Sequence, residues 1–349
     1  MKLLAGVAAI AAVGGGLSLL MRKRTLRVYN YSYYIDPKVI DRFEELYGVE
    51  VIYDEYEAAE EAFAKLRVGG GGYDVIVLAN SYLSEAIKLG LVRRLDHSKL
   101  PNLSNLEPIF FELPFDEGLS YSVPYMWGTT GIGVNTKFVE DKVEGYAQVF
   151  DTEYFLPKYS KKVTMLEEFL EVVQAAKLYL GIDLDDWSEK AVEKVVNLLK
   201  AQKPFLAGYW GASQYVPGLV RGRYLRCAGV ERWRASSAGG GKSRHVRRPK
   251  EGALMWCDLM VIPKGAREVD LAYAWINYML EPEVAAANTA CTCYPNPLKR
   301  SLVENMLSPE ILENPAIYPP SLKELRLPVI LDVKKLKILE YIATEVRGG

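Results

Sequence analysis

Strands and helices alternate between residues 26 and 78, and this order constrains the fold more than any other feature of the chain. Strands are expected at residues 26–29, 49–53 and 73–78, separated by helices at 37–47 and 58–66 and by a glycine turn at 69–72. The first helix has a complete set of end signals, because Asp36 can cap it, Pro37 suits its first position and Gly48 can end it. This alternation predicts an α/β fold with a largely parallel sheet, whose ligands bind beyond the carboxyl ends of the strands.

The length of 349 residues exceeds what one hydrophobic core usually organises, so two lobes are expected. Further helices are predicted at residues 165–180, 189–202, 270–280 and 335–346, a strand is predicted at 260–263, and residues 137–159 are rich in loop formers.

An apolar run from Leu3 to Met21 follows Lys2 and is typical of an export signal or a membrane anchor. Small residues near its end could serve a signal peptidase, and no Cys stands nearby to carry a lipid. Three basic residues, Arg22 to Arg24, follow the run, which is unusual for an exported segment. We therefore expect a periplasmic or other extracytoplasmic location, with residues 1–24 as signal peptide or anchor and both alternatives open.

The composition excludes several classes of protein. A net charge of −1 gives no overall attraction to nucleic acid. The chain has only two His and four Cys, and the Cys all lie after residue 226, so we expect neither a metal nor another cofactor. The thiols are expected to be small buried side chains, with a disulfide from Cys257 to Cys291 or Cys293 as the alternative. The chain contains no GxSxG, HExxH or P-loop motif.

Aromatic residues are concentrated where the predicted strands end. Rings of this kind can surround an alkyl chain and offer their faces to ammonium groups, or they can simply pack loops against the sheet. The aromatic residues in question are Tyr29, Tyr31, Tyr33, Tyr34, Tyr82, Tyr121, Tyr125 and Trp127.

Three carboxylates are candidates for binding a cation. Glu168 and Glu171 stand three residues apart on a predicted helix, after a possible capping box at residues 164–167. They could bind an ammonium group or only complement the helix dipole, and as helix neighbours they suit a glycosidase poorly. Asp258 lies two residues after Trp256, a pairing that suits an ammonium ion.

Several strings in this chain, in this order, resemble the bacterial spermidine/putrescine-binding proteins of polyamine ABC transporters. The resemblance extends from about residue 26 to residue 318. The strings are YNYSYYI (29–35), VIYDEYE (51–57), YDVIV (73–77), LDHSKLPNLSNL (95–106), YSVPYMWGTTGIGVN (121–135), PKEGALMWCDLMVIP (249–263) and YPNP (294–297).

The resemblance implies a two-lobed, hinged periplasmic-binding-protein fold of type II with discontinuous lobes. The first lobe would comprise residues 25–134 and 260–325, the second 135–259, and residues 326–349 would form a C-terminal helix. Such a protein is a receptor and not an enzyme. It would be a monomer that carries a polyamine to a membrane permease of an ABC transporter and binds no nucleic acid. The alternatives are a receptor for another organic cation or small solute and an exported hydrolase using Glu168 or Glu171.

By position, the resemblance places aromatic walls, ammonium-binding carboxylates and a hydroxyl group on particular residues. The departures are Tyr33, where the family often has an acid, and Ser81, where it often has an aromatic ring. The ligand-binding residues expected in this chain are Tyr31, Ser32, Tyr34, Tyr82, Glu168, Glu171, Trp256, Asp258 and Tyr294.

The composition changes abruptly at residues 221–248, with nine Arg or Lys and one acid. The family has an apolar strand here that ends in a ligand-stacking Trp. If the reading frame is shifted one nucleotide ahead, codons for residues 226–233 can encode Val-Ala-Leu-Ala-Trp-Ser-Gly-Gly. We therefore predict compensating frameshifts around residues 222–248, with the loss of an interior strand and of one wall of the site. The alternatives are a solvated basic loop and an anion-binding or nucleic-acid-binding patch.

Overall fold

The computed structural model describes residues 23–220, 226–230, 244–247, 249–314, 317–318, 325–326 and 329–348. The predicted signal or anchor therefore lies outside the described residues, apart from residues 23 and 24. Within the part that the structure describes, no helix is both long and apolar enough to span a bilayer.

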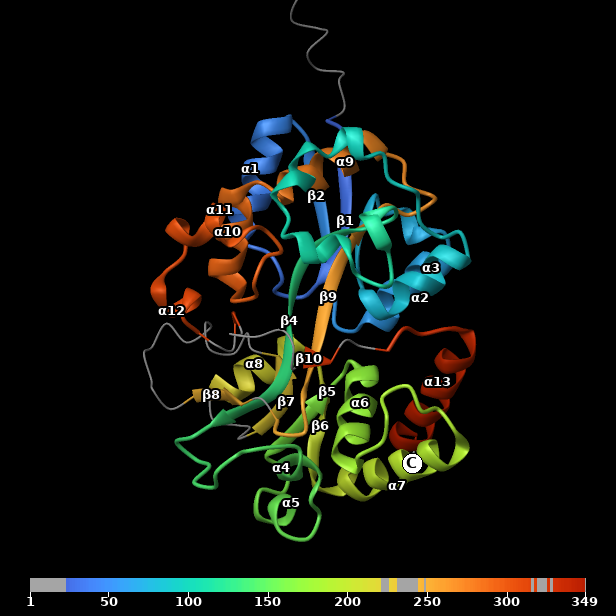
Figure 1. Ribbon diagram of the computed structural model, residues 1–349, viewed down its shortest axis with the longest axis vertical. Helices are drawn as coiled ribbons and strands as arrows, with labels where there is room; N and C mark the ends of the chain where they lie inside the picture. Colours follow the sequence, from blue (N-terminus) through green and yellow to red (C-terminus); the bar gives the residue numbers. More distant parts are fainter. Residues whose placement is uncertain are drawn as a thin grey trace, which may run out of the picture.

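The first lobe, at the top of Figure 1, has the predicted alternation of parallel strands and helices. Its central strand β1 pairs with β2 on one side and with β3 on the other. The Asp36 side chain accepts from Lys38 N, and Gly48 ends the first helix with a φ of 63°. The elements are β1 (Thr25–Tyr31), α1 (Pro37–Tyr47), β2 (Glu50–Tyr56), α2 (Ala59–Arg67), β3 (Val75–Ala79), α3 (Asn80–Lys88), α9 (Val269–Met279), α10 (Pro282–Thr292), α11 (Arg300–Val303) and α12 (Pro309–Leu312).

The second lobe, at the bottom of Figure 1, repeats this plan around β5, which lies between β6 and β7 and is parallel to both. Its elements are α4 (Ala147–Phe150), α5 (Phe155–Lys158), β5 (Val163–Leu166), α6 (Phe169–Leu180), α7 (Glu189–Gln202), β6 (Leu206–Trp210), α8 (Ala212–Val220), β7 (Arg226–Val230), β8 (Arg244–Arg247) and α13 (Val333–Arg347).

Two long antiparallel strands, β4 (Val123–Asn135) and β9 (Ala253–Val261), connect the lobes. Strand β9 also pairs with β3 of the first lobe, and β4 pairs with β7 of the second. The described strands thus form one sheet in the order β2-β1-β3-β9-β4-β7-β5-β6, with β8 beside β4 and β10 (Leu325–Arg326) beside β9. Because these strands belong to both lobes, the predicted lobe limits at residues 134/135 and 259/260 stay a prediction.

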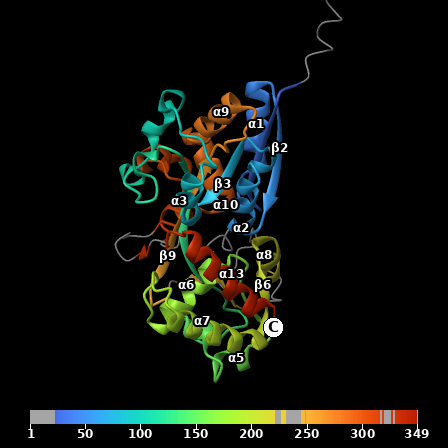
Figure 2. The same ribbon diagram turned by 90° about the vertical axis from the view of Figure 1, so that its right-hand side faces the viewer.

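A third segment passes from the first lobe to the second just before α13. Leu331 N donates to Ser81 O in α3, and Asp332 caps α13 by accepting from Lys335 N. Helix α13 packs on α7 and α6, and Figure 2 shows it beside the second lobe. The predicted C-terminal helix is therefore confirmed, over residues 333–347.

The prediction of a single helix over residues 165–180 is wrong at its start. Residues 163–166 form β5, and α6 begins only at Phe169, with Glu168 at its N-cap. The predicted capping box at residues 164–167 is consequently absent. Val163, Thr164 and Met165 are fully buried, and pairing with β6 and β7 on both sides outweighs the local helix signals.

The expected loss of an interior strand at residues 222–248 is also wrong. The backbone of residues 226–230 forms β7, which pairs with both β4 and β5. Backbone pairing does not depend on which side chains a strand carries, so this finding leaves the frameshift hypothesis as a prediction. Most of this segment, including Trp233, lies outside the described residues. The Cys257 thiol is free, so the alternative of a disulfide to one of the late Cys is wrong.

Candidate functional site

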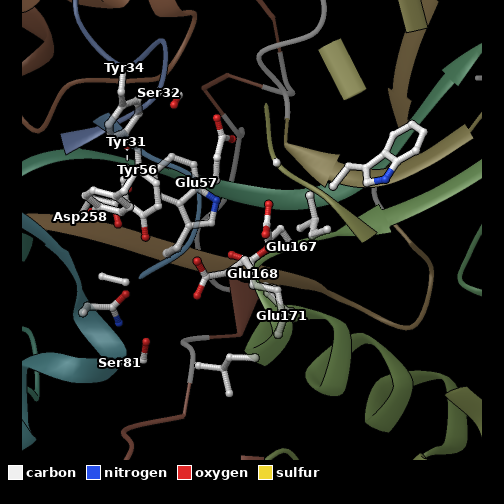
Figure 3. A pocket seen from close by; sticks show the side chains of 18 of the residues that line it. Tyr31, Ser32, Tyr34, Tyr56, Glu57, Ser81, Glu167, Glu168, Glu171 and Asp258 are labelled. Carbon is white, nitrogen blue, oxygen red and sulfur yellow. Dashed lines mark hydrogen bonds between the residues drawn. The ribbon is translucent and has the colours of Figure 1, made fainter. Parts of the chain in front are cut away.

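A cavity lies where the carboxyl ends of five parallel strands from the two lobes face one another (Figure 3). It encloses about 880 Å³ that no atom fills, part of it open to solvent. The side chains come from the last residues of β1, β2, β3, β5 and β6 and the residues that follow them. Others come from β9, from the first turns of α6 and α8, and from the segment after α10. The lining residues are Tyr31, Ser32, Tyr34, Tyr56, Glu57, Ala79, Asn80, Ser81, Leu166, Glu167, Glu168, Leu170, Glu171, Gln174, Trp210, Gly211, Tyr215, Leu254, Trp256, Asp258 and Tyr294.

A group of aromatic rings forms the first-lobe side of the cavity. The Tyr34 ring meets the Tyr294 ring edge-on at 5.1 Å between centroids, and the Tyr31 ring in the same way at 5.7 Å. Trp256 meets Tyr294 edge-on at 5.2 Å. Gly128 of β4 lies against Trp256, and a Cβ atom at Gly128 would be 2.5 Å from the indole. This packing fixes the orientation of the rings toward one another.

Asp258 lies on β9 at the centre of this aromatic group, and only 7% of it is exposed. The Tyr34 hydroxyl donates to Asp258 Oδ2 at 2.8 Å. Tyr34 is itself held by the Tyr125 hydroxyl, which donates to Tyr34 O at 2.6 Å. Two buried hydrogen bonds therefore position one carboxylate at the edge of the cavity.

Glu168 and Glu171 reach the cavity from the second lobe, at the beginning of α6. The Thr130 hydroxyl of β4 donates to Glu171 Oε2 at 2.6 Å. Glu168 Oε2 accepts from Ala59 N at 2.8 Å, and Ala59 is the first residue of α2 in the first lobe. Both carboxylates are thus fixed by bonds to other elements.

Burial shifts the protonation of these three carboxylates. It raises the pKa of Asp258 to about 7 and that of Glu171 to about 7. The pKa of Glu168 is raised well above its usual value, first by burial and then by the nearby charge of Glu60. Among the described residues that line the cavity there is no Lys, Arg or His that could offset this negative charge. A ligand that carries positive charge would oppose these shifts, because a nearby opposite charge favours the ionised carboxylate.

The structure brings eight of the nine predicted ligand residues to the cavity. Tyr82 is the exception, because α3 begins directly after β3 and turns this ring into the core against Phe63, at 5.2 Å between centroids. Tyr82 is therefore not among the residues that line the cavity, and its contact with a ligand stays a prediction. Of the two departures, Ser81 lines the cavity, whereas Tyr33 is 52% exposed and is not among the lining residues.

Sequence reasoning missed several lining residues that follow strands. Tyr56 is the last residue of β2 and Glu57 follows it, so the end of the strand expected at residues 49–53 was the available signal. Trp210 is the last residue of β6, a short strand between two helices, and Gly211 follows it. The apolar residues of this strand were the available signal in the sequence. Tyr215 lies on α8, and no pattern in the sequence marked it as a lining residue.

Comparisons with known proteins agree with one another. A family model described as bacterial extracellular solute-binding protein matches residues 38–319. The putrescine-binding periplasmic protein SpuD of Pseudomonas aeruginosa is 31% identical, over an alignment that covers 97% of this chain and 96% of the relative. The spermidine/putrescine-binding periplasmic protein of Escherichia coli is 33% identical, with 84% and 83% covered. A solved spermidine/putrescine ABC transporter structure from Listeria monocytogenes superimposes with a TM-score of 0.86 at 30% identity, over 93% of this chain and 99% of that one.

Proposed function

Because the chain belongs to the family of bacterial extracellular solute-binding proteins, we propose that it captures a polyamine between its lobes and delivers it to an ABC transporter. The relatives named for binding putrescine or spermidine support this choice of ligand. Their periplasmic names also support a location outside the cytoplasm. We further propose that the receptor works as a monomer.

The observation that carries the proposal is the chemistry of the cavity. Five carboxylates line it, namely Glu57, Glu167, Glu168, Glu171 and Asp258. Burying Glu168, Glu171 and Asp258 without an opposite charge is costly unless they take up protons or meet a cation. A slender aliphatic chain with ammonium groups at intervals fits this lining. Its methylene groups can pack against the aromatic rings, and its positive charges can pair with the carboxylates.

The two ends of the cavity suggest how such a ligand would lie. Asp258 and the rings around it would hold one ammonium group on the first-lobe side. Glu168 and Glu171 would hold another on the second-lobe side, so that one molecule touches both lobes. Ligand contacts with both lobes would stabilise the closed form. Since both glutamates reach the cavity from the same end of α6, they do not face each other across a scissile bond, which argues against a glycosidase.

Calorimetric titration of the full chain with spermidine, putrescine and a neutral sugar tests the proposal. Both amines should bind and the sugar should not. Replacing Asp258→Asn or Glu171→Gln should weaken amine binding by about 10- to 100-fold, because each removes one charge that pairs with an ammonium group. Glu55→Gln is the matched control, since Glu55 accepts from Tyr33 N away from the cavity. Binding of the sugar, or unchanged affinity in both cavity variants, would contradict the proposal.

A further inference from the structure

Two helices that begin at the cavity are preceded by a residue whose side chain cannot accept a hydrogen bond. The N-cap of α2 is Ala58, and the residue before α8 is Gly211. The first amide groups of a helix have no partner inside the helix, and neither Ala nor Gly has a side-chain acceptor for them. Some other group must therefore satisfy these amides or leave them to water.

For α2, part of the cap comes from the opposite lobe. Within α2, Glu61 Oε1 accepts from the amides of Glu57 and Ala58, each at 3.1 Å. The next amide, Ala59 N, donates instead to Glu168 Oε2 at 2.8 Å. Glu168 lies 109 residues further along the chain, at the start of α6 in the second lobe. A second-lobe carboxylate thus completes the N-terminus of a first-lobe helix.

For α8, the relation between the lobes is reversed. Glu57 follows β2 in the first lobe, and its Oε2 accepts from Ser213 N in the first turn of α8 at 3.4 Å. A Cβ atom added to Gly211 would be only 2.0 Å from Glu57 Oε2, so the carboxylate rests directly on the backbone before α8. Figure 3 labels Glu57 and Glu168, both of which line the cavity.

We propose that Glu57–Ser213 and Glu168–Ala59 form a reciprocal interlobe latch, and that Glu57 is a positioning residue that sets ligand affinity through lobe closure. Each carboxylate meets the positive end of a helix whose preceding residue, Ala58 or Gly211, has no side-chain acceptor, an arrangement that stabilises both the helix and the charge. Opening the lobes would break both contacts at once. The latch therefore favours the closed form even without ligand.

The role in affinity rests on the proposed function, whereas the latch itself does not. If only the closed form binds tightly, the apparent dissociation constant is the intrinsic constant divided by the fraction of closed molecules. Loss of Glu57 should then weaken every ligand by the same factor. A residue that touches the ligand would instead change the ratio of affinities for amines of different length.

Two variants remove the same contact by different means. Glu57→Gln removes the charge, and Gly211→Ala displaces the Glu57 side chain without changing any charge. Ala is compatible with the backbone here, because Gly211 is not among the glycines with positive φ. The matched control is Glu55→Gln, whose partner Tyr33 lies in the same lobe. The double variant Glu57→Gln/Gly211→Ala tests whether the two changes act on one contact.

Small-angle X-ray scattering of the ligand-free full chain and titration with spermidine and putrescine provide the readouts. Both single variants should have a larger radius of gyration than wild type. Both should also weaken the two amines equally, by about 3- to 30-fold, as expected for the loss of a helix cap. The double variant should match the single ones, and Glu55→Gln should match wild type.

Unchanged scattering in both single variants, additive effects in the double variant, or a loss confined to one amine would each overturn the latch. If wild type binds neither amine but Glu57→Gln and Gly211→Ala still expand the free protein, the latch stands and the proposed ligand is wrong. A merely structural role for Glu57 would lower stability without changing the radius of gyration, and this result would also overturn the proposal.

Discussion

Asp258, Glu168 and Glu171 are carboxylates for which the described lining of the cavity offers no basic side chain. They could be proposed as site residues through the resemblance of the sequence to the polyamine-binding family, because the Trp next to Asp258 and the three-residue spacing of the glutamates left other interpretations open. Their fixed positions could not, since Tyr34, Thr130 and Ala59 hold them from elements remote in the sequence. The sequence shows the type of a group, whereas its pKa depends on burial that only the folded chain provides.

The pKa of Asp258, raised to about 7, predicts how stability depends on pH. Between pH 4 and pH 7 the folded protein holds a proton that the unfolded chain has lost, so the free energy of unfolding falls as pH rises through this window. Ligand-free protein should be more stable at pH 5 than at pH 8, by roughly 1–4 kcal/mol. Urea denaturation at both pH values measures this, and Asp258→Asn should reduce the difference. An equal difference in Asp258→Asn and wild type would contradict the assignment.

At the level of elements, local signals sufficed where each helix carries its own end signals. Asp36, Pro37 and Gly48 predicted α1 correctly, and α7 is found where its periodicity placed it. Local signals failed where pairing with a segment distant in the sequence determines the structure. The strands β5 and β6 were missed because each is only four or five residues long and depends on pairing with the other. The full length of β9 was missed for a similar reason, since it is buried throughout and has no alternation to reveal it.

Strand β7 yields a prediction of its own. It lies between β4 and β5, a position that usually carries apolar side chains, yet its sequence begins with Arg226. Replacing residues 226–233 with Val-Ala-Leu-Ala-Trp-Ser-Gly-Gly should raise the free energy of unfolding by about 2 kcal/mol or more. Chemical denaturation of both chains measures this change. A control with the same eight new residues in shuffled order should not gain stability, and equal or lower stability of the replaced chain would contradict the frameshift hypothesis.

At the scale of the whole molecule, the cavity belongs to neither lobe alone. Its carboxylates come from both, and two strands of one sheet join them. The two-lobed α/β architecture could be predicted from chain length and the early alternation of elements. The pairing of particular side chains across the cavity could not, because it depends on the distance between the lobes and not on any local pattern.

A ligand that contacts both lobes should stabilise the protein as one unit. With spermidine at 100 times its dissociation constant, the free energy of unfolding should rise by about 2.7 kcal/mol, in a single transition. Differential scanning calorimetry measures both features, and a neutral sugar at the same concentration serves as control. A trace in which spermidine shifts only part of the heat absorption would show that the ligand binds one lobe alone.

The three crossings between the lobes restrict how they can move. Strands β4 and β9 are held in mutual register, and the segment at residues 329–332 is tied to α3 by the bond from Leu331 to Ser81. A single connection would let one lobe swivel about the other, whereas the three connections among the described residues oppose twisting and leave bending as the easier motion. A permease that distinguishes empty from loaded receptors could then do so by the angle of that bend.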